Sequence, residues 1–195
     1  MKKTTYNSIA LIGTSADPPT TGHKALFIGL SKLFPKVVTW ASNNPWKEHR
    51  TSLEQRHELL DILVNAINLP NLELRQGLSN QWTLITLEHA KDFWPDKRFM
   101  LIIGSDLVSS IPNWFEAEKV VNRAQIGIVP RQGWPINNSE LNVIKKMGGD
   151  TIVLPLDIPA SASSAIHSSP HLSYIPKAIL PILKQKNLYG ISQQQ

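Results

Sequence analysis

The sequence contains no cysteine, no long apolar run and neither of the common glycine-rich phosphate motifs, Gly-x-x-x-x-Gly-Lys and Gly-x-Gly-x-x-Gly. The absence of cysteine excludes disulfide bonds and thiolate metal sites. No segment approaches the roughly 20 apolar residues that span a bilayer. The polar residues 1–7 lead into a short apolar run that ends at Gly13, which does not fit a secretory signal. We therefore expect a cytoplasmic protein that does not bind membranes.

The length of the chain limits the number of domains, and its net charge favours one class of ligand. A chain of 195 residues fits one domain, and we expect residues 1–195 to form it, with a helical C-terminal part over about 160–190. The formal net charge of +5 favours anionic ligands. The lysines and arginines are scattered rather than clustered, which favours small phosphorylated substrates over nucleic acid.

Short apolar runs alternate with longer segments of helical periodicity. We expect strands at residues 9–12, 36–41, 72–74, 99–103, 126–129 and 152–154. We expect helices at residues 25–34, from 52 to 67, and at 83–93, 115–121, 141–147 and 176–186. Ser52 and Gln55 form a capping box, and Gly148-Gly149 ends the fifth helix. This order predicts an α/β fold, a doubly wound, Rossmann-like parallel sheet with helices on both faces.

Residues 13–23, Gly-Thr-Ser-Ala-Asp-Pro-Pro-Thr-Thr-Gly-His, connect the first predicted strand to a helix. In doubly wound sheets, ligands bind beyond the carboxyl ends of the strands, where the strand order reverses. Unpaired N–H groups and the helix dipole favour an anion at such a helix start. Gly22 lets a ligand oxygen approach the backbone, and His23 and Thr20 offer side-chain hydrogen bonds. We predict that this segment binds nucleotide phosphates.

The same residues resemble a known family. Thr20-Thr21-Gly22-His23 resembles the (His/Thr)-x-Gly-His signature of the nucleotidyltransferase superfamily, and residues 13–18 resemble its Gly-(Thr/Ser)-Phe-Asp-Pro, with Ala16 in place of Phe. Nearly the whole chain resembles the bacterial nicotinate-nucleotide adenylyltransferases. The further matching segments are residues 81–87, 93–107, 111–114, 128–133 and 161–167.

The resemblance implies an activity. The protein would transfer the adenylyl group of ATP to nicotinate or nicotinamide mononucleotide, forming deamido-NAD or NAD and pyrophosphate in NAD biosynthesis. Its partners would be ATP and a pyridine mononucleotide, with Mg²⁺ accompanying the ATP phosphates as cofactor. Catalysis would rest on positioning and on neutralising charge that develops on the phosphates. The number of subunits stays open, a homo-oligomer included.

The resemblance also implies roles for individual residues. Asp106 can accept hydrogen bonds from ribose hydroxyls, Trp114 can stack on the pyridine ring, and Arg56 either supports the loop before it or contacts substrate. The implied catalytic residues are His23, Thr20 and Lys47. The implied ATP-binding residues are Gly13, Thr14, Ser15, Gly22, His23, Asp106, Ser163, Ser164 and His167. The implied mononucleotide-binding residues are Lys47, Trp82, Thr83, Gly104, Asp106 and Trp114.

Three positions, Ala16, Thr20 and His167, keep alternatives open. Ala16 stands where Phe is usual, Thr20 gives the Thr form of the signature, and His167 stands where the family has arginine. Arginine is a permanent cation that grips two oxygens, whereas histidine is mostly neutral at pH 7. The alternatives are a nucleotide-binding regulatory protein with weak or lost turnover, and an adenylyltransferase for another acceptor such as phosphopantetheine. No histidine has the spacing of a metal site, because the His57-Glu58 helix lacks a second histidine.

Overall fold

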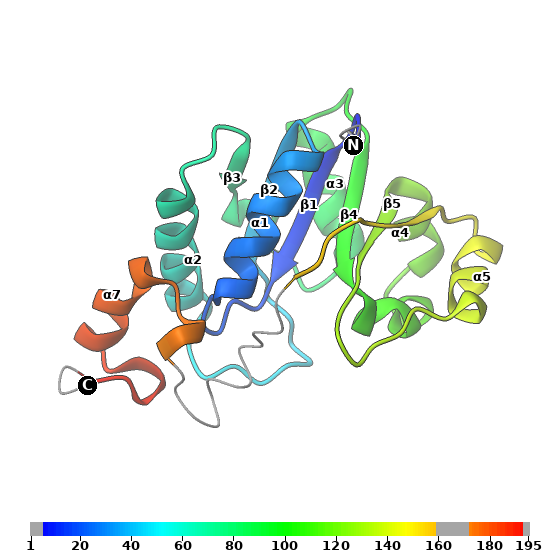
Figure 1. Ribbon diagram of the computed structural model, residues 1–195. Coiled ribbons are helices and arrows are strands. Elements are labelled where there is room, and N and C mark those ends of the chain that lie inside the picture. The colour runs from blue at the N-terminus through cyan, green and yellow to red at the C-terminus, as the bar shows by residue number, and fades with distance from the viewer. Residues whose placement is uncertain (1–5, 159–171, 193–195) are drawn as a thin grey trace.

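A computed structural model describes residues 6–158 and 172–192 (Figure 1). Six parallel strands form one sheet in the order β3-β2-β1-β4-β5-β6, which confirms the predicted α/β fold. The order reverses between β1 and β4, so the expected ligand position lies beyond Thr14 and Gly104. The strands are β1 Ile9–Thr14, β2 Lys36–Ala41, β3 Leu72–Leu74, β4 Phe99–Gly104, β5 Gln125–Val129 and β6 Thr151–Val153.

Helices cover both faces of the sheet and create two apolar cores (Figure 1). Alternate residues of β1 serve the two cores: Ala10 and Ile12 face one, and Ile9 and Leu11 face the other. This is why β1 reads as a continuous apolar run rather than an alternating one. Helices α1 (Thr21–Leu33) and α2 (Leu53–Ile67) cover the first face, and α3 (Thr83–Phe93), α4 (Ala117–Arg123) and α5 (Asn138–Lys146) cover the second.

The C-terminal segment packs beside α2, where it is drawn in red in Figure 1. Its elements are η3 (Leu172–Tyr174), η4 (Lys177–Ile179), α7 (Leu180–Gln185) and η5 (Leu188–Gly190). Ile179, Leu183 and Ile191 are buried in the core that α1 and α2 form. The predicted helix over 176–186 is thus a short 3₁₀ turn followed by α7.

Several helix and strand boundaries in the structure differ from the predicted ones. Helix α1 starts at Thr21 rather than at residue 25, because Thr20 and His23 form a capping box that the sequence analysis missed. Gly13 and Thr14 belong to β1 and not to the loop after it. Between the predicted strand at 99–103 and the predicted helix at 115–121, the chain forms a 3₁₀ helix, η2 (Ser105–Asn113).

Other boundary signals are confirmed. Ser52 and Gln55 form the predicted capping box of α2. After α5, Gly148 adopts a φ of +87°, and its N–H bonds to the Lys145 carbonyl at 3.0 Å. A short 3₁₀ helix, η1 (Gln76–Leu78), links β3 to α3. Among residues 6–158 and 172–192, no helix combines the length and the apolar composition needed to cross a membrane.

Candidate active site

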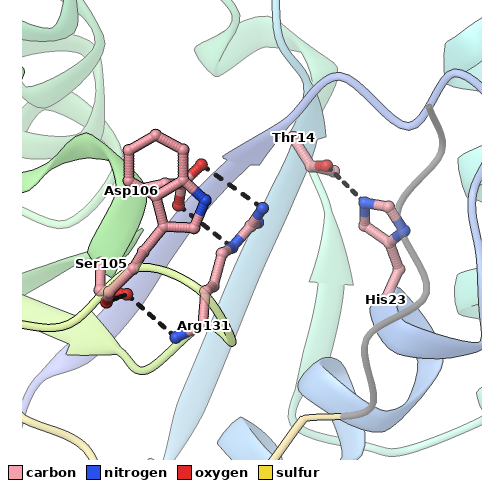
Figure 2. A network of polar contacts seen from close by, with 6 residues as sticks. Thr14, His23, Ser105, Asp106 and Arg131 are labelled. Atoms are coloured by element: carbon pink, nitrogen blue, oxygen red, sulfur yellow. Dashed lines mark hydrogen bonds and ion pairs between the residues drawn. The ribbon is translucent and has the colours of Figure 1, made fainter. Parts of the chain in front are cut away.

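His23 lies at the start of α1, beside the end of β1 (Figure 2). Its Nε2 atom is 2.8 Å from Thr14 Oγ1. Its Nδ1 atom accepts a 3.0 Å hydrogen bond from the Thr20 backbone N–H and lies 2.9 Å from Thr20 Oγ1. Two neighbouring segments therefore hold the imidazole ring at both nitrogens.

This geometry determines which nitrogen carries the proton of neutral His23. Nδ1 accepts the Thr20 N–H, so the proton is on Nε2, and Nε2–H donates toward Thr14. Burial, together with the positive charges of Arg131 and Lys47, lowers the pKa of His23 to about 4. At neutral pH His23 is thus an uncharged donor whose N–H is fixed in direction.

Thr20 occupies a different place from the one expected. Its side chain has no exposed surface, and its hydroxyl is engaged with His23, accepting the His23 backbone N–H at 3.4 Å. The Thr20 hydroxyl is therefore used in contacts within the protein and is not presented directly to a phosphate. Thr20 caps α1 and orients the His23 ring instead.

Gly13 was predicted to bind ATP, but in the structure its close neighbour is a side chain of the protein. A Cβ atom at Gly13 would lie 2.8 Å from Trp40 Nε1, because the Trp40 indole of β2 packs against the glycine. The close approach that requires glycine is made by this ring. Thr14 and Ser15 are partly exposed beside it, and the Thr14 carbonyl accepts a 2.8 Å hydrogen bond from the Ser42 N–H.

Asp106 pairs with Arg131 at the ends of β4 and β5 (Figure 2). Arg131 Nε is 3.2 Å from Asp106 Oδ1, and Nη1 is 3.5 Å from Oδ2. The Arg131 backbone N–H donates to Ser105 Oγ at 2.9 Å. Gly104 leaves room for this pair, since a Cβ there would be 2.2 Å from Asp106 Oδ1. In the view of Figure 2, Arg131 lies between Asp106 and the Thr14–His23 pair.

Lys47 is exposed in the connection between β2 and α2. Buried Asp17 anchors the end of this connection through both carboxylate oxygens, accepting the Arg50 N–H at 2.7 Å and the Thr51 hydroxyl at 2.7 Å. Arg56 is also buried, and its Nη1 donates to the carbonyls of Ser15 and Ser42, each at 2.9 Å. Of the two roles considered for Arg56, its contacts support the loop-bracing one.

Aromatic side chains gather where α3 begins and η2 ends. Trp82 precedes Thr83, the first residue of α3, and its ring lies 5.0 Å from the half-exposed Phe115 ring, centroid to centroid. Trp114 directly follows η2, and its Nε1 donates to Ser110 Oγ at 3.1 Å. The structure thus pairs predicted residue Trp82 with Phe115, an aromatic side chain that the sequence analysis did not select and that follows Trp114 in the chain.

Three predicted residues, Ser163, Ser164 and His167, lie outside the described residues. In the parts that are described, no group of three His, Asp or Glu side chains could hold a metal ion. The sequence analysis also missed Arg131 and Asp17 as site residues. Arg131 follows a strand in a segment that matches the family, which was an available signal, but its pairing with Asp106 depends on the order of strands in the sheet.

Comparisons with known proteins show which family the chain belongs to. The sequence model of the cytidylyltransferase-like family matches residues 11–192. A probable nicotinate-nucleotide adenylyltransferase from Synechocystis is 31% identical over 93% of this chain and 98% of its own length. Plasmodium falciparum nicotinic acid mononucleotide adenylyltransferase, solved with NaAD, superposes with a TM-score of 0.77 at 21% identity, over 96% of this chain and 99% of that one. The same enzyme complexed with APC gives a TM-score of 0.73 at 22% identity, with the same coverage.

Proposed function

Because the chain belongs to the cytidylyltransferase-like family, and within it to the nicotinate-nucleotide adenylyltransferases, we propose that it transfers the adenylyl group of ATP to nicotinate mononucleotide. The products are deamido-NAD and pyrophosphate, in NAD biosynthesis. The relatives carry this activity in their names, and the Plasmodium enzyme was solved with NaAD. The preference for the nicotinate form over the nicotinamide form rests on these names.

One observation supports the chemistry most directly. His23 is neutral at pH 7, and its Nε2–H is held beside Thr14 at the position where the strand order reverses. An incoming phosphate oxygen can replace Thr14 as the acceptor of this hydrogen bond. Because the donor is already oriented, little reorganisation is needed when charge develops on the phosphates.

The reaction itself needs no covalent intermediate. A 5′-phosphate oxygen of the mononucleotide forms a bond to the α-phosphorus of ATP, and the bond from that phosphorus to the oxygen bridging to the β-phosphate breaks. Pyrophosphate leaves with the bonding electron pair. His23 and Lys47 would stabilise the added negative charge on the non-bridging oxygens. Thr20 would act through His23, as a positioning residue.

The mononucleotide would lie toward β4 and α3. Asp106 Oδ1 is shielded from solvent, and it faces Arg131 Nε at 3.2 Å without forming a hydrogen bond of good geometry among the described residues, so it can also accept from a ribose hydroxyl. The paired rings of Trp82 and Phe115, and the ring of Trp114 directly after η2, would offer faces to the pyridine. The Thr83 N–H, in the first turn of α3, suits the pyridine carboxylate.

Magnesium enters this proposal as part of the substrate, MgATP. The described residues offer no cluster of metal ligands, which fits an ion that triphosphate oxygens and water hold. The protein's own contribution is to bind and orient the phosphates.

The test measures pyrophosphate release by the full chain. MgATP or MgCTP is supplied with nicotinate mononucleotide, nicotinamide mononucleotide or phosphopantetheine. We expect release with ATP and nicotinate mononucleotide above all other pairs. Release only with phosphopantetheine would overturn the proposal, and ATP binding without release from any acceptor would favour a regulatory protein.

A matched pair of variants then tests the role of His23. His23→Asn keeps an acceptor for the Thr20 N–H but lacks the Nε2 donor, and we expect it to lower kcat on the order of 10²-fold. His89→Asn changes a residue of α3, outside the segment 13–23, and should leave kcat unchanged. Equal losses of activity in the two variants would contradict the role given to His23.

A further inference from the structure

Arg131 is a charged residue at the candidate active site, and it has no role in the reaction proposed above. It directly follows Pro130 at the end of β5, and its guanidinium reaches across the end of β4 to Asp106. Its backbone is held by the 2.9 Å hydrogen bond to Ser105 Oγ and by a bridge to Trp134. A fixed backbone and a directed side chain together indicate a built position rather than a solvated surface charge.

The pairing with Asp106 leaves part of the guanidinium available. Nε and Nη1 face the two carboxylate oxygens, at 3.2 and 3.5 Å. Nη2 has no partner among residues 6–158 and 172–192. More than half of the side chain is exposed to solvent. Arginine carries five donor hydrogens in a planar fork, so it can hold Asp106 with one edge and an anion with the other.

Two observations relate Arg131 to His23. Arg131 stands between Asp106 and the Thr14–His23 pair in the view of Figure 2. Burial lowers the pKa of His23 most, and the positive charge of Arg131 lowers it further, as does that of Lys47. The Arg131 guanidinium therefore acts electrostatically on the ring whose Nε2–H is proposed to donate to a phosphate oxygen.

We propose that Arg131 is a catalytic residue that binds phosphate oxygens at the point of adenylyl transfer while Asp106 holds its guanidinium in place. This inference rests on the proposed function. The oxygens concerned belong to the α-phosphate of ATP and to the attacking phosphate of the mononucleotide, two groups that repel each other as they approach. A planar cation bound to both lowers this repulsion and favours the in-line geometry in which one P–O bond forms as the other breaks.

Gly104 fits the same account. A side chain there would lie 2.4 Å from Arg131 Nε and 2.2 Å from Asp106 Oδ1. Because Gly104 has no side chain, the Asp106–Arg131 ion pair can lie close to the backbone at the end of β4. In this proposal Asp106 accepts a hydrogen bond from a ribose hydroxyl and also orients Arg131. The Asp106–Arg131 pair would therefore serve both the mononucleotide and the phosphates.

The experiment compares Arg131→Ala and Arg131→Lys with Arg123→Ala. Arg123 is a suitable control, because it is also a partly exposed arginine paired with a carboxylate, Glu88, but on α4. We expect Arg131→Ala to lower kcat on the order of 10²-fold and to weaken MgATP binding about tenfold, with adenosine binding unchanged. Arg131→Lys should keep MgATP affinity within a few-fold but recover little of kcat, because an ammonium cannot grip two oxygens. Arg123→Ala should match the wild type.

A double-mutant cycle separates direct contact from an indirect effect through Asp106. If Arg131 only positions Asp106, then Arg131→Ala added to Asp106→Asn should cause no further loss of kcat. Direct contact predicts a further loss of at least tenfold. As an independent readout, an NMR titration should show a higher pKa of His23 in ligand-free Arg131→Ala than in the wild type.

The outcomes are distinct from those of the functional test. If neither pyridine mononucleotide is a substrate, the proposed function fails, while the comparison of MgATP with adenosine still decides whether Arg131 binds phosphates. Wild-type kcat and MgATP affinity in Arg131→Ala, or no further loss in the double variant, would overturn the inference.

Discussion

Tyr189, in the last described turn of the chain, donates a 2.5 Å hydrogen bond to Asp17 in the loop after β1, although 172 positions separate them. The Thr51 hydroxyl lies 2.7 Å from the Tyr189 hydroxyl and from Asp17 Oδ1. Burial and the bond to Asp17 raise the pKa of Tyr189 far above its usual range, so its hydroxyl remains a donor. The C-terminal segment thus braces the loop proposed to bind ATP.

Replacing Tyr189 by Phe should show how much this contact contributes. The change removes one hydrogen bond to a buried carboxylate and should lower the free energy of unfolding by about 1–3 kcal/mol. Denaturant unfolding measures it. Tyr6→Phe is the control, because Tyr6 stacks on Phe34 through its ring alone in the described contacts, and the change should cost far less. Equal stabilities of the two variants would mean that the Tyr189 hydroxyl is energetically idle.

Arg56 should be needed for both stability and ATP binding. Arg56→Ala leaves the carbonyls of Ser15 and Ser42 without their buried donor, which should cost roughly 2–4 kcal/mol of unfolding free energy. Arg98→Ala, at an exposed position, should cost less than about 0.5 kcal/mol. Urea unfolding and MgATP titration of both variants check this. An Arg56→Ala protein with wild-type stability and MgATP affinity would refute the bracing role.

The pH dependence of stability follows from the lowered pKa of His23, about 4 in the folded state against about 6.5 when unfolded. Between these values the unfolded chain binds more protons, so the free energy of unfolding falls as the pH falls from 6.5 toward 4. Allowing for partial exposure of the ring, the loss should be roughly 1–3 kcal/mol. His23→Asn cannot titrate and should lack this part of the loss. Parallel pH profiles for the two proteins would contradict the assignment.

A methyl group at Gly104 should disturb catalysis more than folding. Gly104→Ala would force Asp106 and Arg131 apart from the backbone, and we expect kcat/KM to fall at least about tenfold. The free energy of unfolding should change by less than about 1 kcal/mol, since both side chains are partly exposed and can shift. Gly77→Ala is the matched control, because nothing lies within 4 Å of its added Cβ. A similar kcat/KM in both variants would exclude the crowding mechanism.

Much of the fold could be predicted because its signals are local. The apolar runs of β1 and β4 and the capping box of Ser52 and Gln55 each depend on a few neighbouring residues. The prediction that residues 13–23 bind phosphates was likewise drawn from a strand, a short loop and a helix start, and it stays a prediction. The Thr20–His23 capping box was missed because histidine replaces the usual Glu or Gln of the motif.

The pairings across the sheet could not be predicted. A sequence states that Asp106 and Arg131 each follow a strand, but their contact requires β4 and β5 to be neighbours in register. The same holds for Tyr189 and Asp17, whose contact depends on where the C-terminal segment packs.

The sequence by itself therefore determined the class of fold, the family resemblance and the loop expected to hold the phosphates, since short-range periodicity and motifs encode them. Only the tertiary structure decided that the Thr20 hydroxyl is engaged with His23, and that Arg131 pairs with Asp106 across the ends of two strands. Direction and distance between side chains from different elements arise from packing, which no single stretch of sequence specifies.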